Sequence, residues 1–175
     1  LDCDLNNRLF PHWIMGEFSE IAGDPYLAAG QTYESGLARG QIWVVARMSM
    51  GVRRMPRSEE ELLVSLWFRG DDGKYLFHDC EFRSPQGELL ISCSAAHRPM
   101  DLFRGCAIPV SEIADRLIAP VDARAAAPEC RRIMPQGPLV PLGSRKMMFS
   151  DLDRNRHGNN AIYTRIAQDF LPPEY

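Results

Sequence analysis

The N-terminal part of the chain contains one clear helical pattern. Apolar residues over 9–23 recur three and four positions apart, which predicts a helix over this range. Its apolar face would consist of Phe10, Trp13, Ile14, Phe18, Ile21 and Ala22. Gly23, Asp24 and Pro25 form a stretch that typically ends a helix. The small and polar residues over 30–40 then predict a loop.

Four strand patterns follow the helix, and short turns separate the last three of them. They cover residues 41–50, 61–69, 74–83 and 88–98. The first is apolar almost throughout, which predicts that both of its faces are covered. Gly70-Asp-Asp-Gly73 and Ser84-Pro-Gln-Gly87 predict tight turns, because Gly allows positive φ and Pro fits a turn position. A helix followed by antiparallel strands predicts an α+β domain in which helix and sheet bury each other's apolar faces.

The pattern changes after residue 100. Six prolines and an alanine-rich run predict a linker between domains, with a short helix over 110–118 capped by Ser111. A strand start over 146–149 and a second helical pattern follow. We therefore predict domain boundaries at residues 1–110, a linker over 111–139, and the start of a second domain over 140–175. A single helix cannot bury its own apolar face, so this second domain needs a sheet from further residues or from a partner chain.

A short internal repeat supports two related domains. Asp2-x-Asp4-x-Asn6 echoes Asp151-x-Asp153-x-Asn155 about 150 residues later, and both copies precede a helical pattern. The first copy has no His at the corresponding place. We interpret it as a loop that belongs to the fold and does no chemistry.

Composition and charge narrow the class of protein. Of the 175 residues, 45 % are hydrophobic and 25 % are charged, as in ordinary globular domains. The net charge of −3 argues against a nucleic-acid-binding surface. No apolar run is long enough to insert into a membrane, and we predict a cytoplasmic protein. Five widely spaced cysteines without zinc-ligand spacing predict reduced thiols and no metal site.

The candidate chemistry lies in the stretch Ser150–Tyr163, which reads SDLDRNRHGNNAIY. Asn and Asp favour turns and helix caps, so a polar loop carries an imidazole to the start of the second helix. A helix start stabilises developing negative charge, and His titrates near neutral pH. The alternating acids at the start resemble a calcium loop, but the Gly and closing Glu of such a loop are absent at the required offsets.

This stretch also resembles a known signature, that of the acyl-acyl-carrier-protein (acyl-ACP) thioesterases. The matching residues are Asp151, Leu152, Asp153, Asn155, His157, Asn159, Asn160 and Tyr163. Trp43-Val-Val-Ala-Arg47-Met48 is similar to a strand of the same family. Gly158 stands where the family usually has Val, and Ile166 where it often has Trp. The resemblance implies a tandem double hotdog fold, a long helix wrapped by a curved antiparallel sheet in each domain, with the second domain incomplete here.

The resemblance also implies an activity and a site. The expected reaction is hydrolysis of a fatty acyl thioester on acyl carrier protein or coenzyme A, with no cofactor. The expected catalytic residues are Asp153, Asn155 and His157, and the substrate-binding ones are Gly158, Asn159 and Asn160. The family's last active-site residue, a Cys or a carboxylate, would lie beyond Tyr175. The expected partners are acyl carrier protein and a possible second copy in a homodimer.

Two other readings of the sequence remain open. One is a hotdog protein that binds acyl thioesters without turning them over. The other is a dimerising hotdog scaffold, and an apolar tunnel beside His157 would argue against it.

Overall fold

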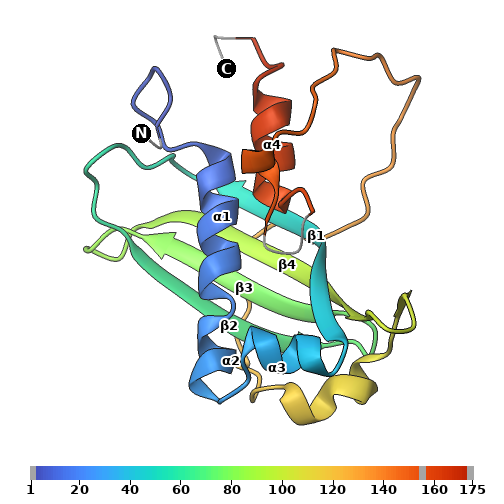
Figure 1. Cartoon of the computed structure of the whole chain (residues 1–175). Coiled ribbons are helices and arrows are strands. Elements are labelled where there is room, and N and C mark those ends of the chain that lie inside the picture. The colour runs from blue at the N-terminus through green and yellow to red at the C-terminus, as the bar shows by residue number, and fades with distance from the viewer. Residues whose placement is uncertain (1–2, 154–156, 173–175) are drawn as a thin grey trace.

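The computed structural model describes residues 3–153 and 157–172, and it consists of one antiparallel sheet with helices on one face (Figure 1). The helices are α1 (Pro11–Ile21), α2 (Asp24–Ala28), α3 (Tyr33–Ala38) and α4 (Asn160–Gln168), and the 3-10 turns are η1 (Val110–Arg116) and η2 (Phe149–Asp151). The strands are β1 (Gln41–Val52), β2 (Leu63–Asp71), β3 (Leu76–Arg83), β4 (Leu89–Asp101) and β5 (Cys106–Ala107). The strand order is β1-β4-β3-β2, with β5 paired to β4. This confirms the α+β prediction.

Helix α1 forms the centre of the first core. Pro11 starts it at a position where a missing N–H costs nothing, and Ile14 and Phe18 are fully buried against the sheet. Their neighbours in the core include Leu9, Cys80, Phe82, Leu90, Ile91, Cys93 and Ala95. The predicted helix and its end are therefore confirmed, and Cys80 and Cys93 are small buried residues of this core.

The predicted loop over 30–40 is wrong in its middle, where α3 forms. Thr32 caps this helix, since its side-chain oxygen accepts the N–H of Ser35 at 3.0 Å. Gly36 lets the helix approach its neighbours closely. A Cβ at this position would lie 2.7 Å from both Arg116 Nη2 and the Gln41 carbonyl oxygen.

The strands and both predicted turns are confirmed. Strand β3 pairs with β2 through the turn that contains Gly73 (φ 80°), and with β4 through the turn that contains Gly87 (φ 88°). Strand β1 differs from its prediction, because none of its residues is fully buried. It is an edge strand that pairs with β4 alone among the described strands. Its apolar run reads like a buried strand, but Val44 is 41 % exposed.

Residues after β4 continue to pack on the first domain. Ile108, Val110 and Ile113 join Phe68 and Leu76 in a second buried cluster, so η1 belongs to the core. Its predicted cap at Ser111 is wrong, since Pro109 is the N-cap and no side chain caps the turn.

Beyond η1, an extended strap over 119–130 crosses the outer face of the sheet. Buried Asp79 holds it there, because its carboxylate accepts the Ala125 N–H at 2.9 Å and also contacts Ser94 and Arg69. The Trp67 Nε1–H adds a hydrogen bond to the Ala123 carbonyl.

The chain then leaves the sheet. Residues 131–148 contain no helix or strand and swing outward, as the orange segment of Figure 1 shows. The predicted strand over 146–149 is not formed, and η2 begins at Phe149 instead. Many apolar side chains of this segment are exposed, among them Ile133, Met134, Leu139, Val140, Leu142 and Phe149. A strand needs a neighbour for its backbone groups, and none of the described strands adjoins this segment.

A buried pair of histidines, His78 and His97, lies between α1, α2 and the sheet. The Nδ1 atoms of His78 and His97 are 3.2 Å apart, and the Tyr26 hydroxyl lies 2.9 Å from His78 Nε2. Burial lowers the pKa of His97 to about 4. Burial and the neighbouring His97 hold the pKa of His78 well below its usual value. Both rings are therefore neutral in the folded chain at neutral pH.

This pair predicts loss of stability in mild acid. The unfolded chain protonates His97 below its ordinary pKa of 6.5, whereas the folded chain takes up that proton only near pH 4. The free energy of unfolding should therefore fall as the pH drops from about 6.5 to about 4, by on the order of 3 kcal/mol for His97. Urea unfolding at a series of pH values measures this slope. A His97→Gln variant should flatten it, and an unchanged slope in that variant would contradict the assignment.

Candidate functional site

The candidate site is built on a loop that closes on itself just before α4. Leu152 and Gly158 form an antiparallel bridge at its neck. The Asp153 N–H donates to the His157 carbonyl at 2.9 Å, and the His157 N–H donates to Asp153 Oδ1 at 3.2 Å. The structure thus brings two of the three predicted catalytic residues together. The third, Asn155, lies outside the described residues.

The predicted substrate-binding residues form the start of α4. Asn159 is the N-cap, and its side-chain oxygen accepts the Ala161 N–H at 3.0 Å. Asn160 is the first helical residue. Gly158 is packed closely, since a Cβ there would lie 2.8 Å from Met147 Cε and 3.1 Å from the Tyr163 hydroxyl. Tyr163 itself is 59 % exposed.

Asp151 anchors the loop, a role that sequence analysis missed by treating it as a turn residue. Its side chain is fully buried and accepts hydrogen bonds from Arg145 Nη2, Arg165 Nη2 and the Met148 N–H, at 2.6 to 2.9 Å. The Met148 N–H is the main group that holds the pKa of Asp151 below its usual range, against the opposing effect of burial. The sequence contains both partners of this carboxylate, Arg145 six residues before Asp151 and Arg165 fourteen residues after it, but their spacing forms no recognisable motif.

The internal repeat is visible in the backbone. In the first copy, Cys3 and Leu9 form the neck bridge, and the Asp4 N–H donates to the Arg8 carbonyl at 2.7 Å. Asp4 Oδ1 accepts the Arg8 N–H at 2.9 Å, as Asp153 does for His157. Helices α1 and α4 follow the two loops at the same distance. The two copies therefore share one geometry, and Arg8 occupies the place of His157.

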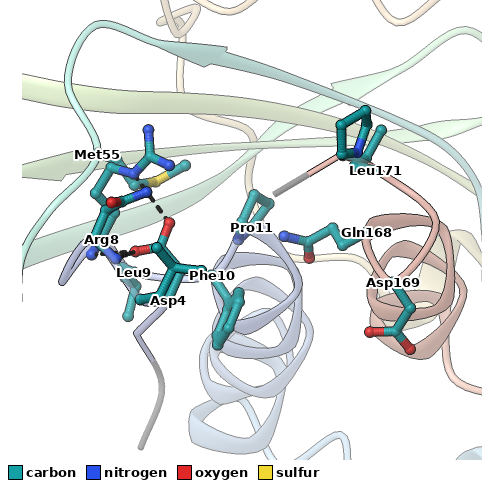
Figure 2. A pocket seen from close by; sticks show the side chains of 12 residues that line it. Asp4, Arg8, Leu9, Phe10, Pro11, Met55, Gln168, Asp169 and Leu171 are labelled. Atoms are coloured by element: carbon teal, nitrogen blue, oxygen red, sulfur yellow. Dashed lines mark hydrogen bonds and ion pairs between the residues drawn. The ribbon is translucent and has the colours of Figure 1, made fainter. Parts of the chain in front are cut away.

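His157 lies at the surface of the described residues, and it does not line either of two pockets formed by other described residues. The first pocket, of about 350 Å³, lies between the first loop and the far end of α4 (Figure 2). Asp4, Arg8, Phe10, Met55, Gln168 and Leu171 line it. The second lies on the other side of the same loop, beside Trp13 and Arg57.

The loop and α4 together supply an imidazole beside a helix N-terminus, and among the described residues His157 is exposed and the helix start is half-buried. The α4 N-terminus offers backbone N–H groups next to His157, and such groups stabilise an oxyanion. Asp153 points one oxygen at the loop backbone, which fixes the loop's shape. Among residues 3–153 and 157–172, no cluster of three His, Cys, Asp or Glu side chains could hold a metal ion. No helix of this described part is long and apolar enough to cross a bilayer.

Several solved structures with the same fold are named as thioesterases. A structure named as an oleoyl thioesterase from Lactobacillus plantarum superposes on this chain with a TM-score of 0.81 and 22 % sequence identity. The superposition covers 98 % of this chain and 66 % of that one. A 12:0-ACP thioesterase from Umbellularia californica gives a TM-score of 0.74 at 20 % identity, over 99 % and 72 %. An acyl-ACP thioesterase from Bacteroides thetaiotaomicron gives 0.75 at 17 %, over 99 % and 70 %.

These similarities establish the hotdog fold. The chain spans about two thirds of the length of the first of these structures. No protein-family model matches the sequence, and no curated protein is similar enough to match it. The predicted hotdog fold is therefore confirmed, and the division into domains stays a prediction.

Proposed function

We propose that this chain belongs to the acyl-ACP thioesterases and hydrolyses fatty acyl thioesters. The observation that carries the proposal is the closed loop at the start of α4, which joins Asp153 to His157 in a chain with the hotdog fold. Three solved structures with this fold are named as oleoyl or acyl-ACP thioesterases. Acyl carrier protein is the proposed thiol carrier, and coenzyme A is the alternative within the same reaction.

In the proposed mechanism, water attacks the thioester carbonyl beside His157. The imidazole takes a proton from the water, and the developing oxyanion lies against the backbone N–H groups at the start of α4. Asn155 is proposed to orient the water or hold the carbonyl. Collapse of the tetrahedral intermediate releases the fatty acid and the carrier thiol, which regains a proton from the imidazolium.

The site needs a second sheet to be complete. Only Ala161 of α4 is fully buried, and among helices and strands α4 makes its main contacts with α1. The exposed apolar side chains of 133–149 lie in the segment that leads to it. We propose that a second hotdog sheet, from further residues or from a second copy, covers α4 and encloses His157. Such a sheet would also supply the apolar channel for an acyl chain.

Thiol release from purified acyl-ACP tests the activity directly. The chain, together with any residues that follow it in its gene, should release thiol from acyl-ACP faster than from acyl-CoA. Faster release from the coenzyme A thioester would mean that acyl-CoA is the preferred substrate. No release from either substrate would contradict the proposed function.

A binding protein without turnover is the second candidate. The surface position of His157 favours it, because none of the described pockets brings an apolar ligand to the imidazole. Acyl-ACP that binds without thiol release would identify this function. In that case the loop at 152–158 would be a contact for the carrier.

A further inference from the structure

The two copies of the loop differ in the helix residue that stands opposite the start of each loop. Each loop is closed by an equivalent aspartate, Asp4 in the first copy and Asp153 in the second, and each has an antiparallel bridge at its neck. In the copy that carries the imidazole, a buried carboxylate is tied to the middle of the following helix, through Asp151 and Arg165. The counterpart of Asp151 in the first copy, Asp2, lies outside the described residues. The residue of α1 that corresponds to Arg165, counted from the equivalent loops, is Gly16. The first loop therefore closes without such an arginine on its helix.

This comparison separates folding of the loop from its placement. Loop closure needs Asp4 in one copy and Asp153 in the other, since each accepts the N–H of the residue four positions on. Among the described residues, the hydrogen-bond partners of the Asp151 carboxylate lie outside the neck. It joins three segments instead: Arg145 on the incoming chain, Met148 at η2 and Arg165 on α4.

We propose that Asp151, held between Arg145 and Arg165, is the positioning residue that sets the His157 loop on α4. Two anchors then fix the imidazole. The Asn159 cap ties the end of the loop to the start of α4, and Asp151 ties its beginning to the middle of the same helix. Helix α4 in turn packs on α1, where the Thr164 hydroxyl contacts the Met15 sulfur. A kinetic test of this inference rests on the proposed function, whereas a spectroscopic test rests on the geometry alone.

The kinetic test uses Asp151→Asn, which keeps the shape of the side chain and removes its charge. Thioester hydrolysis should lose about 10²-fold in kcat, with KM changed by less than about threefold, because a misplaced catalytic group affects the reaction more than binding. Asp79→Asn is the matched control, since Asp79 is an equally buried carboxylate that holds the strap on the far face of the sheet. It should lower the melting temperature and leave kcat within about threefold.

The spectroscopic test needs no activity. The backbone amide resonances of 152–153 and 157–158 should shift in Asp151→Asn and in Arg165→Met, whereas those of the first loop, 4–9, should stay in place. Arg165→Lys keeps a cation beside the carboxylate and should return the resonances toward those of the unmodified chain. The first loop serves as an internal control in the same sample.

The outcomes separate the two proposals. If the unmodified chain releases no thiol, the proposed function fails, and the resonances still decide the role of Asp151. If both loops shift equally, or if neither shifts, Asp151 does not position the second loop. If Asp151→Asn does not fold, Arg165→Met and Arg165→Lys give the answer, because they leave the carboxylate and its bond to Met148 intact.

Discussion

Replacement of His157 by Ala should lower kcat/KM for thioester hydrolysis by about 10²–10⁴-fold, the usual contribution of a general base. The imidazole lies at the surface of the described residues, so its removal opens no cavity and breaks no core contact. The free energy of unfolding should therefore change by less than about 0.5 kcal/mol. Initial rates of thiol release, together with urea unfolding, measure both quantities on the same preparation.

His12→Ala is the matched control for this variant. His12 lies on α1 and contacts Gln168 through its Nδ1 atom at 3.2 Å, away from the loop at 152–158. It should keep the rate of the unmodified chain. Full activity in the His157 variant would remove this residue from the mechanism. An equal loss in both variants would point to a general change in the helix pair instead.

Phe18→Ala should lower the free energy of unfolding by about 3–5 kcal/mol, as expected when a large buried aromatic side chain leaves a cavity. Phe18 is fully buried at the centre of the contact between α1 and the sheet. A loss of this size is a large share of the stability of an ordinary domain, so the variant should unfold at a much lower urea concentration.

Phe149→Ala provides the comparison, since Phe149 is 93 % exposed. It removes the same side chain and should change the free energy of unfolding by less than about 0.5 kcal/mol. Circular dichroism during urea unfolding measures both variants. Equal effects would mean that the core is not organised around α1.

The local pattern was enough to predict the first part of the fold. The spacing of Ile14 and Phe18 gave the helix, and Gly73 and Gly87 gave the turns, because each of these signals acts within a few residues. Helix α3 was missed because one side-chain bond from Thr32 starts it, and the small residues that follow resemble a loop. Strand β1 was misjudged because an apolar run looks the same at the edge of a sheet as at its centre.

The candidate site was predicted only where its residues are neighbours in sequence. Asp153 and His157 are four positions apart, and the structure joins them within one loop. The anchor at Asp151 depends on Arg165, which lies fourteen residues away on α4. The His78 and His97 pair depends on the register of β3 against β4. Contacts of this kind follow from tertiary packing and strand register, which the periodicity of a sequence does not contain.

The open side of β1 has a consequence for how the protein is made. A nascent chain completes β1 and β4 well before α4 leaves the ribosome. At a synthesis rate of roughly 5–20 residues per second, the stretch from β4 to residue 175 takes about 4–15 s. During that time one edge of the twelve-residue strand β1 has unpaired backbone groups, and none of the described strands pairs with this edge in the folded chain either. The bulge between Val45 and Arg47 interrupts the regular edge and makes pairing with another nascent chain less favourable.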